Sequence, residues 1–131
     1  MKSFTKVIPV GQGFITIPVF CCFRSKGYNL EVSINALLDT TSKQSKISKD
    51  IADTFGIPFR RRYDKGEKKV AMRILTLNLP SEITFEDIYV LEDEEEHLGY
   101  DFVIGMDILK QGDAVISARG GEIWFTFYGP E

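Results

Sequence analysis

An aspartate stands at the end of an apolar stretch and is followed at once by three hydroxyl side chains. The stretch is residues 32–38, the acid is Asp39, and the hydroxyls belong to Thr40, Thr41 and Ser42. Burying a carboxylate at the end of a hydrophobic strand costs free energy, so this position is a candidate functional site. An aspartate can also open a turn through its own side chain, and that interpretation stays open for Asp39 taken alone.

A second element, about sixty residues later, favours the functional interpretation. Residues 102–104 are apolar, Gly105 follows, and residues 106–109 have the composition of a short helix that contains Asp107. Hydrolysis of an amide bond needs an activated water and a proton donor at the carbonyl oxygen, and two carboxylates that share one proton supply both. The two elements together therefore indicate half of an acid–base peptidase site, with Asp39 as its acid.

The elements that must position these residues are mostly short strands. Alternating or continuous apolar residues predict strands over 14–23, 30–38, 70–79, 83–91, 100–104, 114–117 and 122–128. Ser48 as a cap and Gly56 as a terminator predict a helix over 48–55, and residues 106–110 predict a second, shorter one. Residues 60–72 predict a β-hairpin with an exposed tip. The predicted fold class is mainly β, a barrel with one or two short helices.

Length and composition bound the domain organisation and the partners. A chain of 131 residues with 44% hydrophobic side chains predicts a single domain over 1–131, with residues 1–13 as an N-terminal segment. A net charge of −3 gives no general reason to expect nucleic-acid or membrane partners. No signal peptide is recognisable, and the adjacent cysteines Cys21 and Cys22 cannot staple distant loops, so we expect a cytoplasmic protein.

At its two motifs the chain resembles the retropepsin-like aspartic peptidases, the single-domain relatives of the retroviral protease. The resemblance spans roughly residues 14–127 and is carried by ALLDT at 36–40 and VIGMDIL at 103–109. In that family an apolar-apolar-Asp-Thr-Gly segment precedes an apolar-apolar-Gly segment that leads into a short helix. The resemblance implies a closed barrel of the retropepsin or acid protease type. It also implies that the hairpin is a substrate-covering flap, with Lys65, Gly66 and Glu67 at its tip.

The resemblance further implies an assembly and a role for each motif residue. Because the chain has one candidate catalytic aspartate, two copies of Asp39 would meet in a homodimer and activate water to cleave a peptide or protein substrate. Thr40 would bond across the two-fold axis, and Ser42 would bond the outer carboxylate oxygen of Asp39. Support beneath the turn would come from Val103, Ile104 and Gly105, with Asp107 at the helix start. No metal ion and no organic cofactor is expected.

Thr41 departs from the family pattern, because the family has glycine at this position. If the turn required positive φ, a β-branched residue there would be strained by about 1–3 kcal/mol. The hairpin also carries lysines in place of a glycine-rich apolar tip. Two alternatives therefore stand beside the peptidase: a catalytically inactive retropepsin-like domain that binds peptide or protein, and a small β-barrel interaction module.

Three further features are predicted to be solvated and without a role in chemistry. Asp53 and Thr54 repeat the acid–hydroxyl pair, but no apolar strand precedes them. The basic residues of the hairpin do not predict a nucleic-acid site, because few aromatic residues accompany them. Residues 92–97 are an acidic run that ends in the single histidine, His97, and a lone histidine in such a run does not indicate a metal site.

Overall fold

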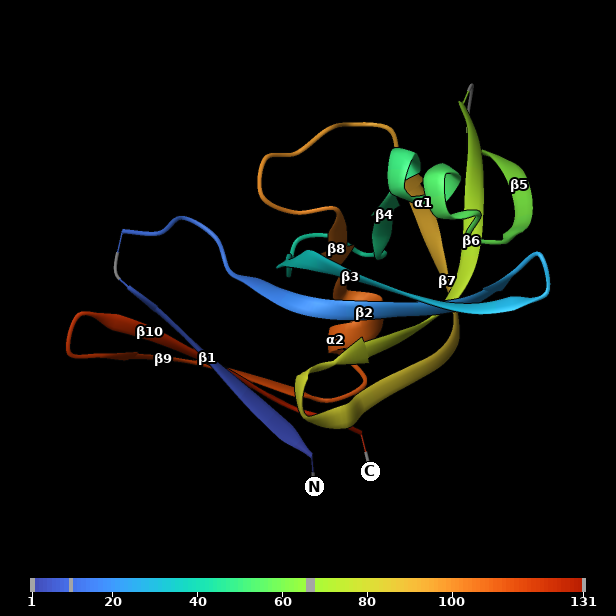
Figure 1. The fold of residues 1–131 in the computed structure, drawn as a ribbon. Coiled ribbons are helices and arrows are strands. Elements are labelled where there is room, and N and C mark those ends of the chain that lie inside the picture. Colours follow the sequence, from blue (N-terminus) through green and yellow to red (C-terminus); the bar gives the residue numbers. More distant parts are fainter. Residues whose placement is uncertain (1, 10, 66–67, 131) are drawn as a thin grey trace.

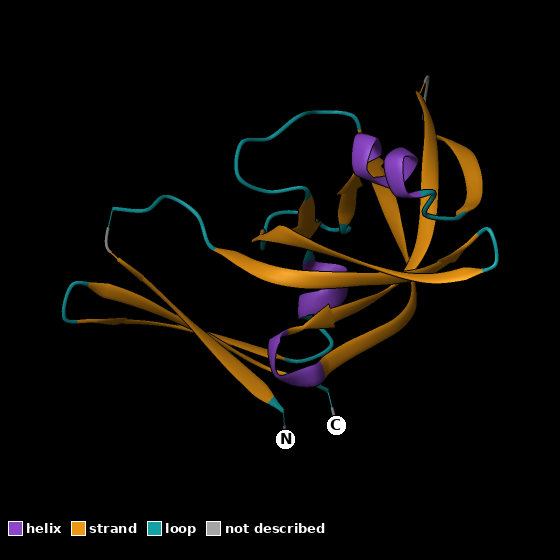
Figure 2. Cartoon of the chain, viewed as in Figure 1, coloured by secondary structure: helices purple, strands orange, loops and turns teal. Residues whose placement is uncertain are grey.

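The computed structural model describes residues 2–9, 11–65 and 68–130, and between 61 and 70 it describes the backbone only. The strands are β1 (Ser3–Pro9), β2 (Thr16–Ser25), β3 (Tyr28–Leu38), β4 (Lys46–Ser48), β5 (Phe59–Lys65), β6 (Lys68–Leu79), β7 (Ile83–Asp93), β8 (Phe102–Ile104), β9 (Asp113–Arg119) and β10 (Glu122–Tyr128). The helices are α1 (Lys49–Phe55), α2 (Met106–Leu109) and a 3₁₀ turn, η1 (Pro80–Glu82) (Figures 1 and 2). Within these residues, no helix has the length and apolar character needed to cross a membrane.

Six of the strands close into a barrel. Their hydrogen-bonded order is β2-β3-β8-β4-β7-β6, and residues 20–22 of β2 pair back with residues 76–78 of β6. Strand β5 pairs with β6 outside this ring, so the β5–β6 hairpin stands out from the barrel (Figure 1). The predicted fold class, a mainly β chain that forms a closed barrel, is confirmed.

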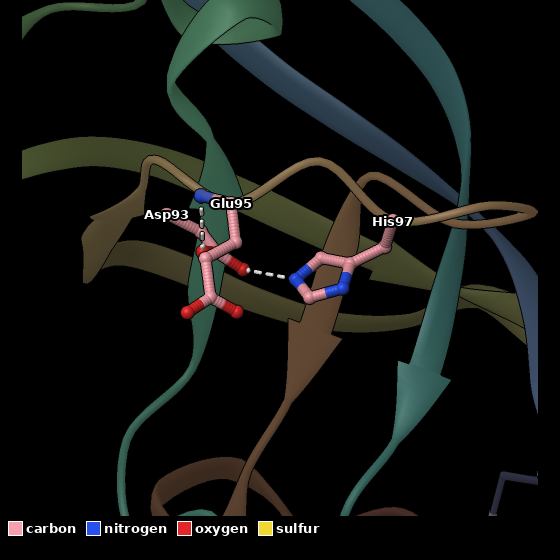
Figure 3. A group of neighbouring side chains, drawn as sticks. All are labelled: Asp93, Glu95 and His97. Carbon is pink, nitrogen blue, oxygen red and sulfur yellow. Dashed lines mark hydrogen bonds and ion pairs between the residues drawn. The ribbon is translucent and has the colours of Figure 1, made fainter.

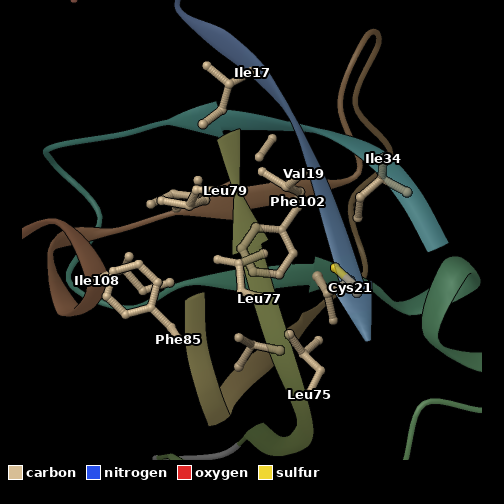
Figure 4. Packing of buried hydrophobic residues seen from close by; sticks show 14 of the residues in the cluster. Ile17, Val19, Cys21, Ile34, Leu75, Leu77, Leu79, Phe85, Phe102 and Ile108 are labelled. Carbon is tan, nitrogen blue, oxygen red and sulfur yellow. The ribbon is translucent and has the colours of Figure 1, made fainter. Parts of the chain in front are cut away.

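The barrel interior is built by alternation along its strands, as the sequence predicts. In β2 the buried side chains are Ile17, Val19, Cys21 and Phe23, every second residue of the strand. Figure 4 shows several of them packed with Leu75, Leu77 and Phe102. Leu30 continues the alternation of Val32 and Ile34 in β3, yet it is 38% exposed. The β2–β3 hairpin extends beyond Cys22, the last residue of β2 that pairs with β6, so its turn lies outside the barrel.

A second sheet, in the order β1-β10-β9, lies below the barrel in Figure 1, with α2 between them. Phe4 of β1 packs against Phe125 and Phe127 of β10, with ring centroids 6.2 and 6.1 Å apart, and all three belong to the same core as the barrel residues. The aromatic residues of 122–128 are therefore partly core. Strand β1 itself was not predicted, because Lys6 interrupts its apolar face of Phe4 and Ile8.

Strand β6 buries an arginine at the base of the hairpin. Arg73 is 2% exposed, and its Nη2 lies 2.6 Å from Glu92 Oε1 and 2.5 Å from Asp53 Oδ1, while its guanidinium stacks 3.5 Å above the ring of Phe59. A buried charge of this kind is tolerated only when it is paired. Asp53 is 45% exposed, as a solvated residue would be, but it also pairs with Arg73 and so joins α1 to the barrel.

Candidate active site

Asp39 is the first residue after β3, and the backbone beneath it is held by the second motif. Strand β8 runs parallel to the end of β3, with Leu37 opposite Val103 and Leu38 opposite Ile104. The N–H of Asp39 continues this ladder by donating to the carbonyl of Ile104 at 3.0 Å. The two motifs, which are far apart in the sequence, thus lie side by side, and their pairing fixes the backbone position of Asp39.

The turn that follows Asp39 is packed directly on Gly105. A Cβ atom at Gly105 would lie 2.8 Å from the carbonyl oxygen of Ser42 and 3.0 Å from the carbonyl carbon of Gln44. Real Cβ atoms do not approach backbone so closely, so this position requires glycine although its φ of −97° is ordinary. The N–H of Met106 also donates to the carbonyl of Ser42 at 2.8 Å. The glycine of the second motif therefore allows the backbone at the start of α2 to pack directly against the backbone of the turn.

Ser45 and Asp107 fasten the other end of the same turn. Ser45 is fully buried; its hydroxyl donates to Asp107 Oδ1 at 2.7 Å and accepts from the N–H of Gly105 at 3.0 Å. The N–H of Ser45 donates to Asp107 Oδ2 at 3.0 Å. The structure places Asp107 in the first turn of α2, where its carboxylate binds the turn. Ser45 was missed, because nothing in the sequence distinguishes it from the neighbouring serines.

Thr41 bonds the carboxylate of Asp39 with both its backbone N–H and its hydroxyl. Both the N–H of Thr41, at 2.9 Å, and its hydroxyl, at 2.5 Å, donate to Asp39 Oδ1. The hydroxyl of Ser42 was expected to bond this carboxylate, but it donates to the carbonyl of Gln44 at 3.0 Å instead. The Ser42 hydroxyl is therefore used inside the turn, and Thr41 supplies the hydroxyl that bonds Asp39.

These contacts decide how Asp39 titrates in a single chain. The hydroxyl of Thr41 holds the pKa of Asp39 below its usual value, partial burial acts in the opposite direction, and the N–H groups of Thr41 and Ser42 and the charge of Lys46 lower the pKa further. In one chain at neutral pH, Asp39 is therefore ionised.

Thr41 does not carry the strain that a positive φ would have caused. Among the described residues, positive φ outside glycine occurs at Lys26, Ser81, Glu82 and Asp87, so the turn at Thr41 does not need glycine for its backbone conformation. Thr40 and Thr41 are both exposed in the single chain. In the single chain, Thr41 therefore adds a hydroxyl at the surface of the turn without straining the backbone.

Asp39 borders a pocket of about 390 Å³. Its other lining residues come from β3, the turn, β4, the base of the hairpin, the end of β7, the loop before β8 and β8 itself: Leu37, Ser42, Lys46, Ala71, Glu92, Asp93, Glu94, Glu95, His97, Tyr100 and Val103. Ala71 is a residue of the predicted flap hairpin, so the base of the hairpin contributes to the wall of this pocket. Of the predicted tip, Gly66 and Glu67 lie outside the described residues, and Lys65 ends β5 opposite Lys68.

The acidic run 92–97 is less solvated than the sequence predicted. Asp93 Oδ2 and His97 Nε2 lie 2.9 Å apart (Figure 3), and their side chains are 14% and 27% exposed. The His97 ring stacks on the ring of Tyr100, with 4.7 Å between the ring centroids. One ligand atom each from Asp93, Glu95 and His97 fall within 4.8 Å of one another, so these are the described side chains best placed to hold a divalent cation. That no metal takes part stays a prediction.

Comparisons with known proteins identify the fold. No protein-family model and no curated protein matches the sequence. The structure is similar to a retropepsin-like aspartic protease from Rickettsia conorii, with a TM-score of 0.64 and 15% identity over 96% of this chain and 93% of that one. It also matches the retroviral protease-like domain of Ddi1 from Leishmania major, at a TM-score of 0.45 and 23% identity over 77% and 81%. The first likeness shows that this chain has the retropepsin-like fold.

The packing at Gly105 generates a first prediction. Gly105→Ala should lower the free energy of unfolding by about 1–3 kcal/mol, because the new methyl group overlaps the backbone of Ser42 and Gln44. The measurement is urea denaturation followed by circular dichroism. Gly13→Ala is the matched control, since its Cβ would meet no atom within 4 Å and its φ is not positive. Equal stability of the two variants would contradict the proposed packing.

The contacts of Thr41 generate a second prediction. Thr41→Val removes the hydroxyl but keeps the shape and the N–H, so the pKa of Asp39 should rise, whereas Thr41→Ser should keep it low. Carboxyl-carbon NMR titration measures both. Because the folded-state pKa is lowered, this bond stabilises the fold above the ordinary aspartate pKa and ceases to do so as pH falls through the folded-state value. The stability gap between the two variants should therefore shrink in acid, and an identical Asp39 pKa in both would refute the assignment.

Proposed function

We propose that this chain is an aspartic endopeptidase that acts as a homodimer, with one Asp39 from each subunit at a shared active site. The observation that supports this most directly is the position of Asp39. Its backbone is held by the second motif at the end of β3, and its carboxylate borders a pocket of about 390 Å³ in a chain with the retropepsin-like fold. The substrate class is a peptide or a protein.

The chemistry requires the second subunit. In peptide hydrolysis one carboxylate accepts a proton from the attacking water while the other, protonated, donates to the carbonyl oxygen of the scissile bond. A single chain holds Asp39 ionised and so offers the base without the acid. Two Asp39 carboxylates brought together cannot both stay ionised, so one proton is shared and the pair titrates in two steps. No metal or organic cofactor enters this scheme.

The remaining motif residues take supporting roles in the proposal. Val103, Ile104 and Gly105 hold the turn from below, and Asp107 positions it through Ser45. Thr40 and Thr41 are exposed in the single chain, which suits a surface that a partner covers. The hairpin that contains Lys65, Gly66 and Glu67 would close over the substrate as a flap. An inactive peptide-binding domain is the alternative outcome of the test below.

Asp39→Asn tests the proposal. Peptide mixtures are incubated with wild type and variant between about pH 3 and 7, and products are read by mass spectrometry. Loss of one carboxylate from each subunit should reduce cleavage at least about 100-fold, since acid–base catalysis contributes that much or more. Asp113→Asn, an exposed change on β9, is the matched control and should leave cleavage unchanged. Cleavage that survives Asp39→Asn removes Asp39 from the mechanism, and a folded wild type that cuts nothing favours the inactive binding domain.

A further inference from the structure

We propose that the pocket beside Asp39 is a subsite for a cationic side chain, so that this protein selects peptides that carry lysine or arginine next to the scissile bond. This inference rests on the proposed function for its link to cleavage. As a binding preference, it can be measured without cleavage.

The charges that line the pocket are unequal. Five carboxylates border it, those of Asp39, Glu92, Asp93, Glu94 and Glu95, and the cationic side chains on its wall are Lys46 and, when protonated, His97. A cleft lined mainly by one sign of charge concentrates ligands of the other sign. The wall therefore attracts a cation and repels an acidic side chain.

Two of these carboxylates are paired with a cationic side chain, and two at the rim are not paired within the part of the chain whose side chains the structure describes. Glu92 pairs with the buried Arg73 at 2.6 Å, and Asp93 lies 2.9 Å from His97. Among the residues whose side chains the structure describes, Glu94 and Glu95 form no ion pair with another side chain. Both are exposed at the rim, so a ligand cation can reach them without breaking any ion pair among the described side chains.

The rest of the lining suits the stem of a long basic side chain. Leu37, Ala71 and Val103 are apolar, and the ring of Tyr100 lies on the same wall. Lysine and arginine bury their methylene stems on such surfaces while the charged head reaches a polar rim. The wall thus offers an apolar floor for the stem and carboxylates for the head, which is the combination that a basic side chain requires.

Tyr100 lines the same pocket, and the charges of the neighbouring carboxylates affect the pKa of its phenol. Burial raises the pKa of its phenol, and the negative charges of Asp93, Asp39 and Glu95 raise it further. These acids come from two segments of the chain, the turn after β3 and the end of β7 with the loop that follows it, and all three line this pocket. The proposed cation would enter the same field with the favourable sign.

The hairpin whose base lines the pocket is rich in basic residues, and this points to an alternative specificity. Residues 60–69 include Arg60, Arg61, Arg62, Lys65, Lys68 and Lys69. A protein that selected substrate through this segment would prefer acidic peptides. The pocket itself, which Asp39 borders, predicts the reverse, and one series of peptides separates the two.

The experiment measures binding and cleavage with the same peptides, in EDTA so that no divalent cation occupies Asp93, Glu95 and His97. Each position of a fluorescent peptide is set in turn to lysine, to norleucine and to glutamate. Binding to Asp39→Asn is followed by fluorescence anisotropy, and cleavage is followed with the wild type. At one position, lysine should bind about three- to tenfold more tightly than norleucine at low salt, and this advantage should shrink at high salt.

A double variant and a matched control assign the preference to the pocket. Glu94→Gln with Glu95→Gln, made in the Asp39→Asn protein, should reduce the lysine advantage to less than about twofold. Glu86→Gln with Glu122→Gln, in the same background, removes the same two negative charges at exposed positions of β7 and β10 outside the pocket, and should leave the advantage intact.

The two proposals fail in different ways. A lysine preference in binding with no cleavage by the wild type supports the subsite and overturns the peptidase. Cleavage without any preference for a cation supports the peptidase and overturns the subsite. A preference for glutamate, or no binding of any peptide, also overturns the subsite.

Discussion

The structure of the site depends on the close packing of one turn against one glycine. Because Gly105 has no side chain, the backbone of residues 42–44 can lie against the start of α2, and the N–H of Met106 can donate to the carbonyl of Ser42. Ser45 and Asp107 then fix the far end of the turn with hydrogen bonds in a buried position, where they are worth more than at the surface. With both ends fixed, Asp39 has a defined starting point at the end of β3. The barrel provides the parallel pairing of β3 with β8 that makes this contact possible.

The charges around this turn divide into a structural group and a free group. The buried Arg73 forms an ion pair with Glu92, and Asp93 bonds His97, so these residues stabilise the wall of the pocket. Glu94 and Glu95 have no such partner among the described side chains, and their charge is left to act on whatever enters. Asp39 belongs to neither group alone. One of its oxygens accepts hydrogen bonds from Thr41, while the carboxylate still borders the pocket. Thr41 therefore tunes the acid that the fold positions.

Local pattern was sufficient to predict the elements that carry the site. Alternation predicted β2 and β3, and Ser48 and Gly56 predicted the ends of α1, whose cap the structure shows. The features that were missed depend on contacts between distant residues. Strand β4 has three residues and exists because β7 and β8 pair with it. The burial of Arg73 depends on its partners on α1 and β7. The role of Thr41 depends on the conformation of the turn, which points its hydroxyl at Asp39. Sequence suggested an obstacle at Thr41, whereas the structure shows a hydrogen-bond donor.

The central claim is that two copies of this turn bring their acids together. The most direct measurement is a crystal structure of the assembled protein, in which the distance between the two Asp39 carboxylates is read. The proposal predicts a two-fold dimer whose Asp39 oxygens lie within hydrogen-bonding reach of each other, at about 3 Å, or of one shared water. A dimer that holds these oxygens far apart, or a chain that stays monomeric with Asp39 facing solvent, would contradict it.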